Sequence, residues 1–478
     1  MPRRPPTAVD QYEALATVLR LVRRNRARTR PELGAAALMG RTVISQRVEE
    51  AMELGLLEDA DTGPSSGGRA PRRLRFRSEE GLVLSAVLGA AALDVAVTDL
   101  DGGVLEHRHL EWPVARGPEE TLDFLDGQFA GLLKGCDAAR LWAVVIGLPG
   151  PVEFATGRPS QPPIMPGWDG YDLRGRLQDR YGVPAWIDND ANLLALGEAW
   201  TTGLDDDRHM IYVKAGTGIG AGIVSGGRIH RGSKGSAGDI GHARVLEDSS
   251  VMCRCGRTGC LEALAGGWAL ARDAVTAVHE GRSRFLADIH RAAGEITPAD
   301  IGLGAAAGDP WCLTAVARAG ERIGSLMAAL VNFYNPDCLV FGGGAVTGAD
   351  TFLRVVDHTV RSRALPLASA DLIVRALRRG RDRRRRGRRP PRRRGTPVGG
   401  RPRGLGAVRK AVGGGARPAR GRSLTHGRAL PPAPMDARRA DARRTDTGRV
   451  THPSCLSRAQ APLEPLTYVC GMHKFPRQ

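Results

Sequence analysis

One histidine and three cysteines lie close together in the sequence and provide a complete set of metal ligands. They follow the spacing His-x10-Cys-x-Cys-x4-Cys and are His242, Cys253, Cys255 and Cys260. An imidazole and three thiolates complete a tetrahedral donor set, and closed sets of this kind hold structural zinc. The alternative is three buried thiols beside an unrelated histidine. The spacing favours the zinc site, which requires this part of the chain to form a loop whose four ligands converge at one point.

Around this loop, residues 81 to 375 alternate apolar strand-like runs, glycine-rich turns and helical patterns, which is typical of an α/β fold. Strands are predicted over residues 82–88, 93–99, 141–148 and 183–188. The last one runs into Asn189-Asp190-Ala191-Asn192 and then into a predicted helix over 193–200. Open α/β sheets place their ligands at the carboxyl ends of buried strands. A carboxylate there can orient a hydroxyl-rich ligand or accept a proton; a helix-capping turn is an equal alternative.

Two glycine-rich segments offer backbone amides to a ligand. Residues 216–220 have the sequence Gly-Thr-Gly-Ile-Gly, and such glycines let amides approach a phosphate closely. Residues 335–344 form a strand-like run that ends in three glycines, a geometry that can accept a nucleotide. A tight hairpin at the first segment and a plain corner at the second are the alternatives, because glycine repeats alone are weak evidence.

The first part of the chain predicts a series of short helices. Over residues 10–24, one helical face carries Tyr12, Leu15, Val18, Leu19 and Val22, which predicts a stripe that faces a core. Thr29 and Pro31 then predict the N-cap and the first turn of a second helix. A tight turn over residues 38–40 separates it from a third helix over 41–50.

The third helix carries the candidate DNA contacts. Four of its apolar residues are expected to face inward: Val43, Ile44, Val48 and Met52. The side chains that remain are suited to phosphates and to base edges in a major groove. They are Arg41, Thr42, Ser45, Gln46 and Arg47. Gly40 stands where a serine or threonine cap would be expected, which predicts a slightly less stable helix.

Residues 63–76 predict a flexible turn between two short strands, a wing. On it, Arg69, Arg72 and Arg73 are placed to reach a minor groove or the DNA backbone. The helix–turn–helix spacing and the wing together predict a DNA-binding domain. A small helical bundle with a solvated charged face is the alternative.

The positive charge of the chain lies in its C-terminal part. The 478 residues include 69 Lys and Arg and 51 Asp and Glu, a net charge of +18. From Ala376 to Gln478 there are 28 basic and 5 acidic residues, so the rest of the chain is mildly acidic. This segment is rich in Arg, Gly, Pro and Ala and predicts a disordered tail, because it cannot bury enough apolar surface to fold. An arginine-rich nucleic-acid tail is one interpretation; we favour a reading-frame shift near residue 376 of a GC-rich gene.

The composition points away from membranes and from secretion. No run of 18 or more uncharged apolar residues is present, and no apolar segment follows the basic N-terminus. Eight cysteines are too few for a disulfide scaffold. Outside the zinc motif they read as small core or tail residues: Cys136, Cys312, Cys338, Cys455 and Cys470. We therefore expect a cytoplasmic protein.

This combination of motifs resembles the repressor, open-reading-frame and kinase (ROK) family, in its winged-helix transcriptional-regulator branch. The resemblance covers residues from about 10 to 375 and depends most on the Asn-Asp-Ala-Asn motif at 189–192 together with the zinc motif. It implies a winged helix-turn-helix domain over residues 1–80 and a two-lobed, actin-like sugar-kinase domain over 81–375, with the sugar between the lobes. The predicted tail occupies residues 376–478.

The resemblance also implies roles for individual residues. The sugar ligands would be Asn189, Asp190, Asp239, His242 and Glu262, and Asp190 matches the catalytic base of the kinase members. His242 would be shared between zinc and sugar. The family usually has glutamate at the position of Asp239, and one methylene fewer shortens the reach by about 1.5 Å. Sugar affinity or sugar choice is therefore expected to differ.

The larger departure from the family concerns ATP. Kinase members handle Mg²⁺ and phosphate with Asp-x-Gly-[Gly/Ala]-Thr in their first hairpin, where this chain has Val87 and Ala91 in place of the Asp and the Thr. A valine cannot coordinate Mg²⁺, on which phosphoryl transfer depends. The resemblance therefore implies little or no kinase activity and no use of ATP and Mg²⁺. It leaves a vestigial nucleotide site at Gly216, Thr217, Gly218 and Gly343.

These implications favour a sugar-responsive repressor of carbohydrate-metabolism genes. A homodimer or homotetramer would bind operator half-sites with each recognition helix in a major groove. A sugar or sugar phosphate between the lobes would change the operator affinity. The alternatives are an ATP-dependent, glucokinase-like sugar kinase that carries a DNA-binding arm, and a nonfunctional remnant. The sequence names neither the sugar nor the operator.

Overall fold

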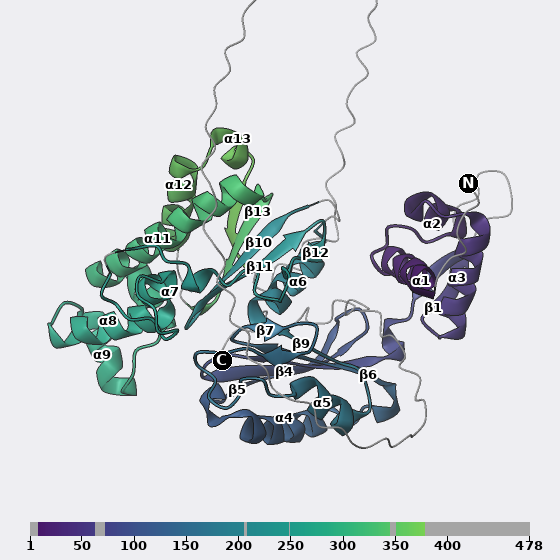
Figure 1. Ribbon diagram of the computed structural model, residues 1–478, viewed down its shortest axis with the longest axis horizontal. Helices are drawn as coiled ribbons and strands as arrows, with labels where there is room; N and C mark the ends of the chain where they lie inside the picture. The colour runs from purple at the N-terminus through teal and green to yellow at the C-terminus, as the bar shows by residue number, and fades with distance from the viewer. Residues whose placement is uncertain (1–7, 63–71, 205–207, 248, 345–349, 378–478) are drawn as a thin grey trace, which may run out of the picture. The chain divides into compact units, whose positions relative to one another are not determined.

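The computed structural model describes residues 8–62, 72–204, 208–247, 249–344 and 350–377 (Figure 1). The predicted tail over 376–478 lies outside the described residues, apart from Ala376 and Leu377. Within the described ranges, every helix is too short or too polar to cross a membrane.

The N-terminal domain has three helices followed by a two-stranded antiparallel sheet. Its elements are α1 (Ala8–Arg23), α2 (Arg30–Ala37), α3 (Arg41–Glu53), β1 (Leu57–Thr62) and β2 (Arg72–Phe76). A reciprocal capping box begins α2: the Thr29 hydroxyl accepts the Glu32 backbone N–H at 3.3 Å, and the Glu32 carboxylate accepts that of Thr29 at 3.1 Å. Gly40 provides no side-chain cap for α3, as predicted. The predicted order of helices and strands is confirmed.

The core of this domain follows the predicted faces with two corrections. The buried residues of α1 and α3 include Leu15, Val18, Leu19, Val22, Ile44 and Val48, and Met52 is half-buried. Tyr12 is 53% exposed, so its predicted inward position is wrong. Residues 11–13 are all exposed, because the first turn of α1 extends beyond the core. The predicted inward position of Val43 is also wrong. Val43 is 40% exposed, because it lies about 100° around α3 from the inward-facing Ile44.

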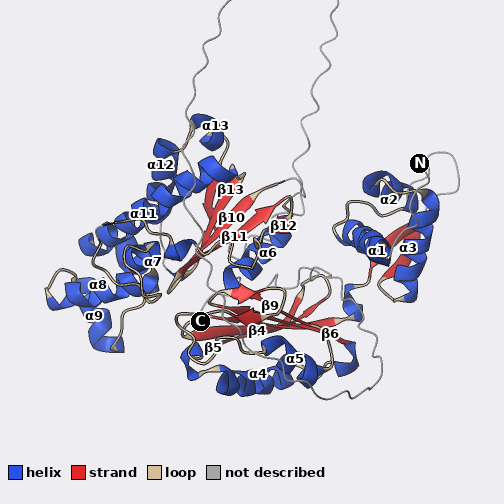
Figure 2. Cartoon of the chain, viewed as in Figure 1, coloured by secondary structure: helices blue, strands red, loops and turns tan. Residues whose placement is uncertain are grey.

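A five-stranded sheet with the order β5-β4-β3-β6-β9 forms the first lobe. Its strands are β3 (Leu82–Leu88), β4 (Ala92–Asp99), β5 (Val104–Glu111), β6 (Leu141–Leu148) and β9 (Ala185–Asn189), so all four predicted strands are confirmed to within two residues. β3 pairs antiparallel with β4 and parallel with β6. One face of the sheet is covered by α4 (Pro118–Leu132) and α5 (Leu173–Tyr181) (Figure 2). The core between these layers includes the fully buried Phe129 and Trp168.

The second lobe repeats this strand pattern with the order β12-β11-β10-β13-β14. Its strands are β10 (Met210–Ala215), β11 (Ile219–Ser225), β12 (Arg228–Ile229), β13 (Cys338–Gly342) and β14 (Ile373–Ala376). Its helices are α7 (Leu261–Ala265), α8 (Gly267–His279), α9 (Arg284–Ala293), α10 (Pro298–Ala306), α11 (Pro310–Tyr334), α12 (Asp350–Arg363) and α13 (Pro366–Ser369). Residues 216–218 form the tight turn of the antiparallel pair β10–β11, which confirms the hairpin alternative for this glycine-rich segment.

Helix α6 (Asp190–Thr202) connects the lobes. It begins directly after β9 and packs on β10 and β11 of the second lobe, where Leu194, Ala195 and Ala199 are buried against Met210 and Tyr212. Figure 1 shows α6 between the two sheets. The helix starts three residues earlier than predicted, which places Asp190 in its first turn.

The turn between α2 and α3 contains a strained residue. Leu38 has φ 54° and ψ 36°, a left-handed conformation that disfavours side chains, and its side chain is 93% exposed. We expect Leu38→Gly to raise the opening free energy of the α2 and α3 amides by about 0.5–1 kcal/mol, measured by native-state hydrogen exchange. Leu54→Gly is the matched control: Leu54 is exposed too but has φ −74°, so glycine should lower stability there. Equal effects of the two substitutions would contradict the argument.

Candidate functional site

A cavity of about 390 Å³ lies between the two lobes. The first lobe contributes the β3–β4 turn, residues 149–151 and the junction of β9 with α6; the second lobe contributes residues 214, 216–220 and 235–239. All the predicted sugar ligands line it, namely Asn189, Asp190, Asp239, His242 and Glu262. So do the predicted nucleotide positions Gly216, Thr217, Gly218 and Gly343. The fold thus brings residues that are far apart in the sequence to one cleft.

Asn189 ends β9 and caps α6. Its Oδ1 accepts the Ala191 backbone N–H at 2.9 Å, and its Nδ2 donates to the Gly150 carbonyl oxygen at 3.0 Å. The helix-capping alternative is therefore confirmed for this residue, which also lines the cleft. Because both ends of the amide are held, Asn189 presents a fixed surface to a ligand.

Asp190 forms an ion pair with Lys214, a residue that the sequence analysis did not single out. The Lys214 ammonium donates to Oδ2 of Asp190, and both residues line the cleft. One of the two oxygens of this carboxylate, a group that a general base would use to accept a hydroxyl proton, is therefore paired with a cation. A signal was present: Lys214 is the one charged residue of the otherwise apolar strand β10, and it lies near the carboxyl end of that strand.

The β3–β4 turn offers no metal ligand where kinase members have one. Val87 and Ala91 both line the cleft. The nearby Asp94 lines it too, but its Oδ1 is hydrogen-bonded to His107 Nε2 at 2.9 Å and to His109 Nδ1 at 3.0 Å. Burial opposes ionisation of Asp94, but these two histidines hold its pKa below the usual value. One oxygen of this carboxylate is thus already hydrogen-bonded to two side chains of β5.

Backbone contacts hold the opposite wall of the cleft. A Cβ on Gly238 or Gly241 would lie within 2.2 Å of a carbonyl oxygen of β11, so only glycine allows this approach. Between them, partial burial raises the pKa of Asp239, and the charges of His242 and Arg257 oppose this shift.

Glu262 is fixed by two hydrogen bonds. Its Oε2 accepts the Ile219 backbone N–H at 3.0 Å, and its Oε1 accepts the indole N–H of Trp268 at 3.3 Å. The first bond ties the start of α7 to the β10–β11 hairpin, and the second ties it to α8. The carboxylate lines the cleft in a defined orientation.

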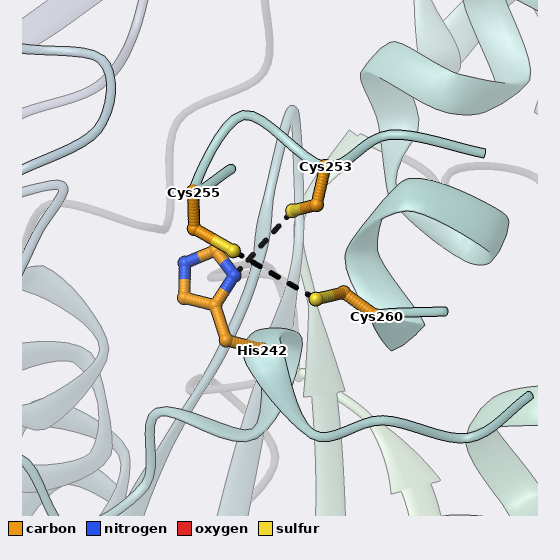
Figure 3. A group of neighbouring side chains, drawn as sticks. All are labelled: His242, Cys253, Cys255 and Cys260. Atoms are coloured by element: carbon orange, nitrogen blue, oxygen red, sulfur yellow. Dashed lines mark hydrogen bonds between the residues drawn. The ribbon is translucent and has the colours of Figure 1, made fainter. Parts of the chain in front are cut away.

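The four predicted metal ligands converge (Figure 3). Their ligand atoms all lie within 4.8 Å of one another, with Cys253 Sγ 3.6 Å from His242 Nδ1 and Cys255 Sγ 3.7 Å from Cys260 Sγ. Ligands at the corners of a tetrahedron with metal–sulfur bonds of about 2.3 Å lie about 3.8 Å apart. The donor set and its spacing therefore fit a tetrahedral metal ion. Burial raises the pKa of Cys253 to about 12, so metal binding would displace protons from the thiols.

The predicted DNA-contact residues differ in their surroundings. Arg41, Thr42 and Gln46 are exposed on α3, and Ser45 is half-buried. Arg47 is half-buried and pairs with Glu50 at 2.7 Å one turn along the helix. On β2, Arg72 pairs with Asp59 at 2.8 Å, and Arg73 is half-buried. Arg69 lies outside the described residues.

Two five-stranded lobes of the same strand pattern with a cleft between them are typical of the sugar-kinase-like class of actin-like folds. The sequence matches the ROK family over residues 83–387, and the chain belongs to the ROK family.

Its relatives include both repressors and kinases. The "Putative xylose repressor" of Caldicellulosiruptor sp. (strain Rt8B.4) is 30% identical over 352 residues, covering 73% of this chain and 87% of the relative. The "DNA-binding transcriptional dual regulator NagC" of Escherichia coli K12 is 26% identical over 369 residues, covering 75% and 87%. The "Glucokinase" of Halalkalibacterium halodurans is 35% identical over 244 residues, covering 51% and 73%.

Solved structures share the fold. A ROK family transcriptional regulator, a homolog of the E. coli MLC protein, superposes with a TM-score of 0.64 at 24% identity, covering 77% of this chain and 92% of the other. A ROK family glucokinase from Streptomyces griseus, in complex with glucose and AMPPNP, superposes with a TM-score of 0.55 at 26% identity, covering 62% and 94%. The two-lobed architecture expected from the sequence is confirmed.

Removal of one thiolate tests the metal cluster. We expect Cys255→Ser to lower the zinc content of the purified protein from about one equivalent to near zero after dialysis against a chelator, because three ligands no longer close the site. The zinc content would be measured by elemental mass spectrometry. Cys136→Ser is the control, since Cys136 lies outside the cluster in the first lobe. Equal zinc in both variants would remove the metal assignment.

Proposed function

We propose that this chain is a sugar-responsive DNA-binding regulator that represses carbohydrate-metabolism genes. The observation that carries the proposal is the presence, in one chain, of a helix-turn-helix domain with a donor-rich exposed α3 and of the two-lobed cleft. The repressor relatives support it, because they match this chain over about 350 residues, more than 100 residues further than the glucokinase. With DNA as its target, the protein would act in the cytoplasm.

In this proposal the N-terminal domain is a winged helix-turn-helix over residues 1–80. α3 enters a major groove, where Arg41, Thr42 and Gln46 contact phosphates and base edges. β1 and β2 flank the wing that approaches the adjacent backbone. Two copies in a homodimer, or in a homotetramer, bind two operator half-sites.

The cleft of the domain over residues 81–375 binds the effector, a sugar or sugar phosphate. Asn189, Asp190, Asp239, His242 and Glu262 provide hydrogen-bonding groups that line it. The cysteine and histidine cluster holds structural zinc, which keeps the loop that carries His242 in shape.

The kinase alternative is less well supported by the site. Val87 and Ala91 leave the β3–β4 turn without the groups that neutralise phosphate charge, and Lys214 occupies the carboxylate of Asp190. Binding without turnover suits a sensor, whose output requires only a difference in ligand affinity between two states.

A direct structural route from effector to DNA runs along α6. Its first turn carries Asp190 in the cleft, and near its other end the Trp200 ring lies 3.9 Å from the Arg23 guanidinium of α1. The Trp200 indole N–H donates to the Asp101 carbonyl oxygen at 3.1 Å, and Arg23 pairs with the Asp101 carboxylate at 3.1 Å. The Arg23 side chain is only 2% exposed. A shift of α6 on effector binding would therefore act directly on the helix-turn-helix domain.

A gel-shift titration on the gene's own upstream DNA tests the proposal. The salt concentration is kept constant because basic segments bind DNA in a salt-dependent way. Under these conditions we expect a discrete, competitor-resistant complex. One member of a sugar panel that includes D-xylose and D-glucose should change its affinity. Salt-labile smearing without any sugar effect would count against a specific regulator, and ADP formation with a hexose would favour the kinase.

Gln46→Ala provides the variant arm of this experiment. Loss of a base-edge contact should weaken operator binding about 5- to 150-fold, corresponding to about 1–3 kcal/mol, while sugar binding stays unchanged. Arg363→Ala removes an exposed residue from α12 and should leave operator binding within about twofold. An unchanged operator affinity of Gln46→Ala would refute the assignment of α3.

Trp200→Leu tests the route along α6. The substitution removes the ring that contacts Arg23, so we expect the sugar dissociation constant to stay within about twofold while the effect of that sugar on operator affinity is largely lost. Calorimetry and gel shifts measure the two quantities. Phe333→Leu is the control, because Phe333 is an aromatic residue of α11 with 88% exposure. A fully retained sugar response in Trp200→Leu would exclude this route.

A further inference from the structure

A segment of the second lobe is anchored on the first lobe beside the cleft. Residues 230–239, here called the interlobe segment, follow β12 and lead to the wall of the cleft that carries Asp239. β12 belongs to the sheet of the second lobe, and β9 belongs to that of the first (Figure 1). We propose that Arg231 of this segment is a positioning residue that holds the ligand groups of the two lobes in register. This inference rests on the proposed function of the cleft.

Arg231 binds the first lobe in two ways. Its Nε donates to Oδ2 of Asp188 at 2.9 Å, and its guanidinium lies 3.8 Å from the centre of the Phe154 ring. Phe154 follows β7 (Val152–Glu153), and Asp188 lies on β9. Asp188 is buried, with 3% of its side chain exposed, and Arg231 is largely covered, with 12% exposed. A buried pair of this kind exerts a strong geometric constraint, because either partner left alone would be an uncompensated charge.

The Asp188 carboxylate also shapes the start of α6. Its second oxygen, Oδ1, accepts the Asn189 backbone N–H at 2.7 Å and the Asn192 side-chain N–H at 2.8 Å. One carboxylate therefore joins Arg231 of the second lobe to the turn that presents Asn189 and Asp190 to the cleft. The orientation of that turn depends on a charge that Arg231 neutralises.

A backbone contact continues the anchor toward the cleft. Gly235 has φ 102°, and a Cβ on it would lie 2.2 Å from the Val152 carbonyl oxygen. From Gly235 onward the segment lines the cleft as far as Asp239, and His242 follows. Two halves of the candidate sugar site, 189–190 and 239–242, are thus linked through contacts that Arg231 begins.

The test compares Arg231→Met with Arg228→Ala by hydrogen exchange and zinc content as well as by sugar binding. Arg231→Met keeps the side-chain length and removes the charge. We expect faster hydrogen exchange at residues 188–192 and 236–242 of the ligand-free protein, at least tenfold weaker binding of D-xylose or D-glucose in calorimetry, and unchanged zinc content. Arg228 is the control because it is exposed on β12, three residues before Arg231.

Two further variants separate positioning from a general loss of fold. Arg231→Lys retains the charge without the Nε geometry and should show a smaller effect. Adding Asp188→Asn to Arg231→Met removes the unpaired buried charge and should restore protection at residues 188–192.

Unchanged exchange at 188–192 in Arg231→Met, or the same exchange pattern in Arg228→Ala, would overturn the proposal. Zinc loss in Arg231→Met would also overturn it, because the defect would then extend through the metal-binding loop. If neither sugar binds the wild-type protein, the exchange experiment still decides the role of Arg231, while the proposed sugar effector would need revision.

Discussion

A buried carboxylate at the end of β9 constrains the arrangement of the whole cleft. Asp188 is almost completely removed from water, and an ionised carboxylate is stable there only when its oxygens are hydrogen-bonded and its charge is paired. The turn at Asn189 and Asn192 satisfies one oxygen, and Arg231 satisfies the other. Because this arginine comes from the second lobe, the need to neutralise a charge in the first lobe fixes the position of a segment of the second.

The candidate metal cluster lies at the other end of the same stretch of chain. His242 belongs to this cluster and also lines the cleft, whereas Arg231 and Gly235 anchor the segment before it. Residues 235–242 are therefore held at two points. Between these points lie Gly238 and Gly241, where close contact with β11 leaves no room for a Cβ. The wall that carries Asp239 thus depends on one ion pair and on glycines at positions where a side chain would not fit.

The features that depend on local patterns could be predicted from the sequence. Buried strands such as 82–88 and 141–148 are continuous apolar runs, and the four metal ligands form a closed donor set whose spacing is visible without a fold. The pairing of Lys214 with Asp190 and of Arg231 with Asp188 could not be predicted. Each pair joins residues more than 20 positions apart, and a single basic residue carries no periodic signal.

The errors at the N-terminus have the same origin. Helical spacing gives the direction in which a side chain points but not where the packing partner ends. Tyr12 has the correct spacing from Leu15, yet it lies on a turn of α1 whose residues are exposed. Val43 neighbours an inward residue, but α3 buries only a narrow face made of Ile44, Val48 and Ala51.

The charges in the cleft are arranged for binding rather than for proton transfer. Asp190, which lines the cleft, is paired with Lys214, and Asp188, two residues earlier on β9, is paired with Arg231. Asp94, which also lines the cleft, is hydrogen-bonded to two histidines. A phosphoryl-transfer site requires the opposite arrangement, an accessible base and acidic groups left open for a metal ion. Neutralised carboxylates still accept hydrogen bonds from hydroxyl groups and give them a fixed geometry. A cleft of this kind can recognise a sugar and change shape around it, and in a regulator the binding energy is available for the movement of α6.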